Sequence, residues 1–166
     1  MTIWKSLIQS KLDYCSQLWT PTDQSCISRL EYWDHLKLFR VYSLERRRER
    51  YCIIFIWKVL QSHVQGYSIP SFTSPWRGRV VLVGQHHSKA PAAVRKAKEA
   101  SLPVHGARLF NLMPRHIRDI SHGTVDQFKY QLDSWLETIP DQPTIPGLQR
   151  AAQTNSLMDQ AAYAVV

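Results

Sequence analysis

The sequence predicts a mainly α fold: a helical bundle of about four main helices with a small two-stranded β element and a disordered C-terminal tail. Apolar residues recur at helical spacing in four long stretches, an irregular stretch interrupts them at 67–100, and the composition changes at Pro140. Hydrophobic residues make up 44% and charged residues 20% of the chain, as in globular proteins that bury a core. We therefore expect one helical domain over 1–139, with an irregular insert at 67–100, and a disordered tail over 140–166.

The first two helices are expected on either side of Pro21. Apolar side chains repeat with helical period over 3–19, and Pro21 ends that pattern. The next helix starts after Thr22 and Asp23, either of which can cap it, and continues to about residue 40.

The third helix carries the strongest terminal signals. Ser43 is a good N-cap residue, and Gly66 suits the position just after a helix, so we expect a helix over 43–66. The apolar run at 51–57 also fits a buried strand, although its long charged lead-in favours the helix.

Residues 67–100 contain prolines and serines and predict mainly loop, with one strand at 79–83. We expect this strand to pair with 101–104. Residues 92–100 suit a short exposed helix or a loop equally well. A short helix is then predicted from Gly106 to Met113, and Thr124 caps an amphipathic helix that reaches residue 139.

The sequence predicts no catalytic residues, no metal site and no cofactor. It contains no phosphate-binding loop and no zinc-binding helix, and its acidic residues are scattered rather than paired at the end of an apolar strand. The three cysteines form no CxxC pair and are expected to be reduced thiols. No signal peptide and no apolar run of membrane-spanning length are evident, so we expect a nuclear or cytoplasmic protein that is not secreted and does not bind a membrane.

The net charge of +8 points to a polyanionic partner, with RNA or DNA first among the candidates. Two clusters carry candidate contacts to backbone phosphates. The first is the arginine run of the third helix, and the second is a tryptophan-containing loop. The candidate nucleic-acid-binding residues are Arg46, Arg47, Arg50, Arg77, Arg79 and Trp76.

Each cluster also has a simpler interpretation. Glu45 and Glu49 interleave with the arginines, so the run also fits a solvated, self-paired helix face. Arg46 and Arg50 share one face of a helix because they are four residues apart. Trp76 can stack on a base, or it can anchor its loop to the core. Both interpretations stay open for each cluster.

Five stretches, taken in order, resemble the C-terminal part of LINE-type (non-LTR) retrotransposon reverse transcriptases of the jockey-like and related clades. They are SLIQSKLDYCSQLWTP, SLERRRERYCIIFIWKVLQ, SPWRGR, VHGARLFNLMPRHIRDI and TVDQFKYQLDSWLETIPDQP. The resemblance covers the chain to about residue 156. It implies thumb-type and linker helices from the region after the polymerase palm, which hold template and primer and supply no chemistry.

One departure from the family pattern follows Glu31, which joins Tyr32 directly where the family has a basic, aromatic helix and a turn. The expected function is therefore that of a non-catalytic remnant of an RNA-directed DNA polymerase that binds RNA or DNA with strong salt dependence and low sequence specificity. The alternatives are a helical protein–protein interaction module, which self-associates through exposed apolar helix faces, and a degenerate product without a selected activity.

Overall fold

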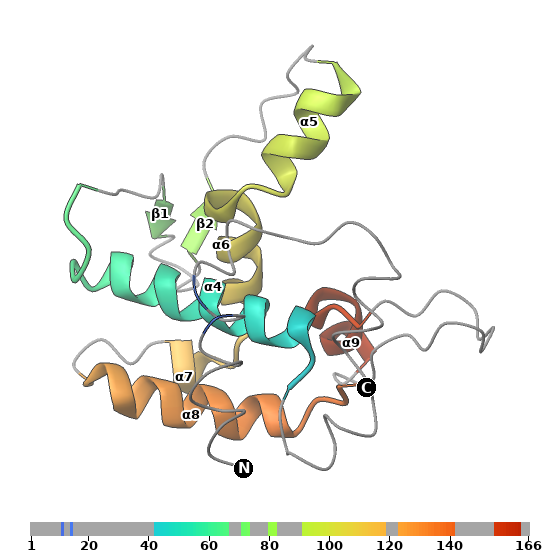
Figure 1. Ribbon diagram of the computed structural model, residues 1–166. Helices are drawn as coiled ribbons and strands as arrows, with labels where there is room; N and C mark the ends of the chain where they lie inside the picture. The colour runs from blue at the N-terminus through green and yellow to red at the C-terminus, as the bar shows by residue number, and fades with distance from the viewer. Residues whose placement is uncertain are drawn as a thin grey trace. The chain divides into compact units, whose positions relative to one another are not determined.

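The computed structural model describes Lys11, Tyr14 and residues 42–66, 71–73, 80–82, 91–118, 123–141 and 155–163. This part of the chain is mainly helical, as the sequence predicts (Figure 1). The helices expected at 3–19 and 22–40 lie outside the described residues, apart from Lys11 and Tyr14. The chain divides into two compact units: Met1–Tyr51 with Ile139–Val166, here called unit 1, and Cys52–Thr138, here called unit 2.

Helix α4 (Leu44–Leu60) begins where the sequence predicts. The Ser43 side-chain oxygen accepts a hydrogen bond from the Arg46 backbone N–H at 3.1 Å, which satisfies one of the free donors at the helix start. The helix ends at Leu60, so the predicted end at Gly66 is wrong.

The reason for the earlier end is a left-handed residue, Ser62, with φ 59°. Its N–H bonds to the Val59 carbonyl at 3.0 Å, and the N–H of His63 bonds to the Lys58 carbonyl at 2.8 Å. These two bonds close the last turn as a Schellman motif, which normally places glycine at the left-handed position. Residue 62 is a serine, so no glycine marks the end of this helix.

Strands β1 (Ser71–Thr73) and β2 (Val80–Leu82) pair antiparallel, with Phe72 opposite Val81. Strand β2 lies inside the range where a strand was predicted, but its partner is β1. The predicted partner, 101–104, is wrong because Leu102 already begins a helix.

Three helices follow: α5 (Ala92–Glu99), α6 (Leu102–Leu112) and α7 (Arg115–Arg118). Ser101 has extended backbone angles at the N-cap of α6, and a proline occupies the first turn, where its missing N–H costs no hydrogen bond. The predicted start of this helix at Gly106 was therefore four residues late.

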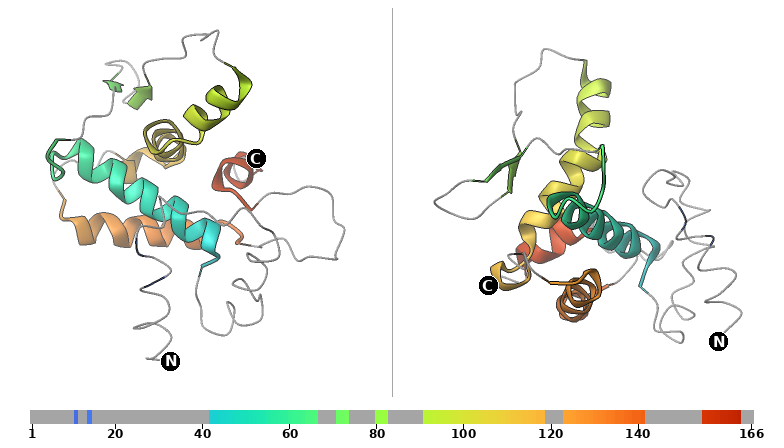
Figure 2. Two further views of the ribbon diagram at one scale, coloured as in Figure 1. Left: turned by 45° about the horizontal axis from the view of Figure 1, so that its top comes forward. Right: turned by 90° about the vertical axis from the view of Figure 1, so that its left-hand side faces the viewer.

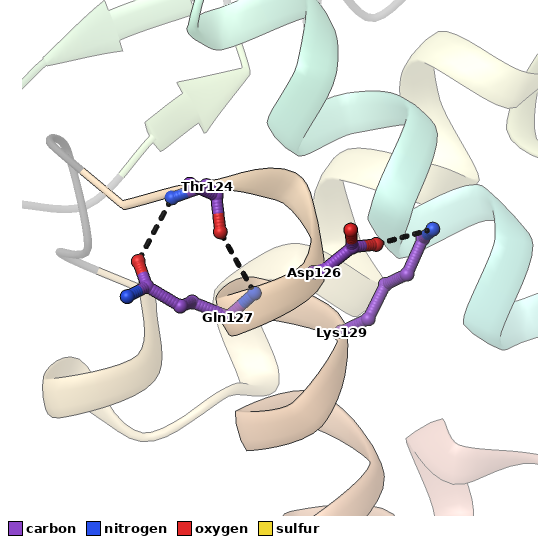
Figure 3. Close-up of polar contacts among 4 residues, drawn as sticks. All are labelled: Thr124, Asp126, Gln127 and Lys129. Carbon is purple, nitrogen blue, oxygen red and sulfur yellow. Dashed lines mark hydrogen bonds and ion pairs between the residues drawn. The ribbon is translucent and has the colours of Figure 1, made fainter.

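Helix α8 (Val125–Glu137) starts with the cap that the sequence predicts. The Thr124 hydroxyl oxygen accepts from the Gln127 N–H at 3.2 Å, and the Gln127 side chain accepts from the Thr124 N–H at 2.9 Å, which completes a capping box (Figure 3). One turn further on, Lys129 pairs with Asp126 at 3.0 Å on the surface.

The core of unit 2 forms where α8 runs antiparallel to the second half of α4 (Figures 1 and 2). The Trp57 ring stacks on Phe128 with 4.7 Å between ring centroids and 12° between planes. Helix α6 packs closely against α4 at Gly106, where an added Cβ would lie 2.9 Å from Cγ1 of Ile56. Other buried apolar residues of this core are Ile53, Leu109, Phe110, Met113, Ile117, Leu132 and Leu136.

The described C-terminal residues belong to unit 1. Helix α9 (Leu157–Tyr163) lies beside the start of α4 (Figure 1), and Leu157 is fully buried. This corrects the expectation of a disordered tail for residues 155–163, because those residues are held by buried hydrogen bonds to α4. Among the described helices, none is both long and apolar enough to cross a membrane.

Candidate nucleic-acid interface

The arginines predicted to bind phosphate on α4 differ in their exposure. Arg46 is 0% exposed and Arg47 is 4% exposed, whereas Arg50 is half-buried. The Arg50 guanidinium carbon lies 5.7 Å from the centroid of the neighbouring Tyr51 ring. Of these three arginines, Arg50 alone presents part of its surface to solvent in this arrangement.

Arg46 is held by the C-terminal residues of unit 1. Its Nη2 donates to the Pro140 carbonyl at 2.9 Å and to the Gln160 side-chain oxygen at 3.3 Å. Its Nε and Nη1 are buried and have no hydrogen-bond partner among the described residues. Both hydrogen-bond acceptors are neutral, and the Glu49 carboxylate interacts with this cation through its charge without a hydrogen bond to it, so the hydrogen-bonding capacity of Arg46 is only partly satisfied.

Glu49, which one of the two interpretations of the arginine run places on a solvated face, is buried and bonds to the C-terminal residues instead. Its carboxylate accepts from the Ser156 hydroxyl at 2.8 Å and from the Leu157 N–H at 3.0 and 3.1 Å. Burial raises its pKa from 4.5 to about 7; the bonds from Leu157 and Ser156 oppose the shift, Glu45 adds to it, and Arg46 opposes it. Glu49 thus links α4 to the start of α9.

A second set of polar bonds joins the same parts of unit 1. Asp141 accepts from the Ser43 N–H at 2.7 Å through one oxygen and from Asn155 Nδ2 at 2.7 Å through the other. The same Asn155 nitrogen donates to the Ser43 hydroxyl at 2.9 Å. Ser43, a helix cap by sequence, therefore also anchors the C-terminal residues, which no local pattern signals.

The loop candidates Trp76, Arg77 and Arg79 lie outside the described residues.

A further basic region lies on helices α5 to α7 of unit 2. Residues 92–118 hold six lysines and arginines against one acidic residue, Glu99, out of a net charge of +8 for the whole chain. Arg115 and His116 are exposed on α7, and Arg108 is half-buried on α6. Burial, followed by the charge of Arg108, lowers the pKa of His105. The sequence shows part of this charge excess, at Arg95, Lys96 and Lys98, but not the exposure of α7.

The described residues gather no group of three or more His, Cys, Asp or Glu side chains that could hold a metal ion. What the arrangement offers is cationic surface: guanidinium groups that can donate paired hydrogen bonds to phosphate oxygens.

Comparison with known proteins adds no relative. No protein-family model matches the chain, and neither a curated protein nor a solved structure matches it.

Proposed function

We propose that the chain is a non-catalytic remnant of the C-terminal region of a retrotransposon reverse transcriptase, which binds the backbone of RNA or DNA through basic residues. The ordered resemblance of five stretches supports the family, and the excess of positive charge supports the partner. The proposal entails a nuclear or cytoplasmic location, where nucleic acid is present.

The observation that carries the proposal is the basic region of α5 to α7. The sequence of this region has an excess of five positive charges over 27 residues, and Arg115 and His116 are exposed while Arg118 is buried; an excess of this kind favours attraction of a polyanion. Arginine contacts to phosphate oxygens release counterions from the nucleic acid and carry no sequence information. Binding of this kind is salt-sensitive and of low specificity.

The residues proposed to contact phosphate are Arg50, Arg108 and Arg115, with Trp76, Arg77 and Arg79 as further candidates from the sequence. Arg46 and Arg47 are buried in this arrangement, so their guanidinium groups are not part of the exposed surface.

Salt titrations of binding to a structured RNA and to a DNA duplex test the proposal. We expect Arg115→Ala to lower affinity and to reduce the slope of log K against log salt for the duplex by about 0.9, the value for one phosphate contact. Lys129→Ala is the matched control, because it removes the same charge from a lysine that is already paired with Asp126. No binding at low salt, or an affinity independent of salt, contradicts the proposal.

Self-association is the competing hypothesis. Tyr130 on α8 is 76% exposed and Val94 on α5 is 55% exposed. Scattered exposed apolar side chains are common on monomeric proteins, so these two residues do not by themselves indicate an interface. Size-exclusion chromatography with light scattering distinguishes the hypotheses, since a concentration-dependent dimer without RNA binding favours self-association.

A further inference from the structure

We propose that Arg46 is a latent phosphate-binding residue, and that the C-terminal segment, residues 139–141 and 155–163, occupies its place in this structure. This inference rests on the proposed function, because its ligand is the same nucleic-acid backbone. It adds that the chain regulates access to its own arginine cluster.

The bonds of Arg46 indicate that the segment stands where an anion would bind. The guanidinium group has five N–H donors, and the Nη2 nitrogen alone makes hydrogen bonds to described residues. The Pro140 carbonyl and the Gln160 amide oxygen fill the position that two phosphate oxygens would take. Because a buried cation with neutral acceptors is incompletely compensated, Arg46 gains most from an acceptor that carries negative charge.

The segment is held by contacts that can be exchanged without unfolding α4. Glu49 accepts from Ser156 and Leu157, Asn155 donates to the Ser43 hydroxyl, and Asp141 accepts from the Ser43 N–H. These are polar contacts whose groups water can satisfy when the segment leaves, so the net contribution of each is about 1 kcal/mol. Burial of Leu157 is the main apolar contribution from the described residues of α9.

Competition between the segment and phosphate has a quantitative consequence. If only the undocked form presents Arg46, the measured affinity is the intrinsic affinity multiplied by the undocked fraction. A substitution that loosens the segment without changing the charge of the protein therefore raises affinity for nucleic acid. This rise in affinity should be lost when Arg46 is also replaced.

The test measures binding of a fluorescein-labelled structured RNA by anisotropy with the full chain. Leu157→Asn places an amide at a fully buried apolar position, and amide hydrogen exchange over 155–163 reports undocking directly. We expect faster exchange and an affinity about threefold to tenfold higher. Adding Arg46→Met, which keeps the length of the side chain but removes its charge, abolishes the increase. Arg46→Met alone leaves binding nearly unchanged, because Arg46 is occluded.

Faster amide exchange over 155–163 with an unchanged affinity for RNA overturns the inference. An increase in RNA affinity that persists when Arg46→Met is added also overturns it. Should Leu157→Asn prevent folding, Asn155→Ala removes two bonds of the segment and is judged in the same way. The proposed function is tested separately by wild-type binding and its sensitivity to Arg115→Ala. RNA binding that appears only in the undocked variant supports the latent site and contradicts the proposed function of the intact surface.

Discussion

The Glu49 carboxylate accepts hydrogen bonds from the Leu157 backbone N–H through both of its oxygens, at 3.1 Å for Oε1 and 3.0 Å for Oε2. The two residues are 108 positions apart in the chain. This contact places a titratable group at the junction between α4 and the C-terminal segment.

The stability of unit 1 should fall as pH rises from about 5 to about 8. The pKa of Glu49 is about 7 in the folded protein and 4.5 ordinarily, because burial penalises the carboxylate more than Leu157, Ser156 and Arg46 favour it. A raised pKa means that the folded form binds the proton more tightly. The contribution of Glu49 is therefore fully present below about 4.5 and is lost as pH rises through about 7, a change of about 3 kcal/mol.

Hydrogen exchange of the Leu157 amide, corrected for its intrinsic pH dependence, measures this effect. Glu49→Gln should remove the pH dependence of Leu157 protection. Above pH 7, the Leu157 amide should exchange more slowly in this variant than in the wild type. Glu45→Gln is the control, since Glu45 only adds to the shift and its removal should leave a slope in place. If Leu157 protection in Glu49→Gln depends on pH as in the wild type, a group other than Glu49 is responsible for the effect.

Asn155→Asp should destabilise unit 1 more than Asn155→Ala does. Asn155→Ala removes two donated bonds and leaves the Ser43 hydroxyl and one Asp141 oxygen short of a donor, which costs about 1 to 3 kcal/mol. Asn155→Asp should cost more, because it places a carboxylate against that of Asp141. Urea unfolding monitored by exchange within α9 gives the order. A milder effect for Asp than for Ala would mean that residue 155 does not face the Asp141 carboxylate in solution.

Ser62→Gly should stabilise the end of α4. Ser62 has φ 59°, a region that costs an L-residue about 1 to 2 kcal/mol, and glycine adopts it without that penalty. Because glycine also gains freedom in the unfolded chain, we expect a net gain of about 0.5 to 1 kcal/mol in thermal unfolding.

Gly66→Ala is the converse test: φ is 75° and no atom lies within 4 Å of the added Cβ, so the conformational cost is isolated. A destabilised Ser62→Gly would contradict the Schellman assignment.

Gly106→Ala should destabilise unit 2, although alanine is ordinarily favoured over glycine in a helix by about 1 kcal/mol. The new Cβ would lie 2.9 Å from Cγ1 and 3.1 Å from Cδ1 of Ile56, which is fully buried, so a shift of its side chain would displace the atoms packed around it. We expect a net loss of about 1 to 3 kcal/mol. In a double-mutant cycle with Ile56→Ala, the two effects should be less than additive, because the added methyl then fills space. Strict additivity would place the two residues out of contact.

Local signals in the sequence predicted the starts of helices well and their tertiary partners poorly. Thr124 forms the predicted cap, and Gln127 completes it as a capping box, because such a cap needs only neighbours in sequence. The start of Leu102–Leu112 was missed because residues 101–104 were assigned to a strand, whereas Pro103 is compatible with the first turn of a helix. The end of α4 was missed because serine, not glycine, takes the left-handed conformation.

The candidate site was predictable in composition but not in exposure. The four-residue spacing puts Arg46 and Arg50 on one face of α4, yet Arg46 is buried and Arg50 half-exposed. Burial of Arg46 depends on residues about a hundred positions away, at Pro140 and Gln160, and helical periodicity carries no information on such partners. The same separation explains why α9 was expected to be part of a disordered tail.

Unit 1 is assembled from both ends of the chain, and this has a consequence during synthesis. Residues 43–49 leave the ribosome long before their partners at 140–160, while all of unit 2 is made in between. Closing a loop of about a hundred residues is slow compared with forming local helices. A nascent chain therefore displays Arg46 and Glu49 to water until translation has passed α9, so cellular polyanions meet this stretch before its own final helix does.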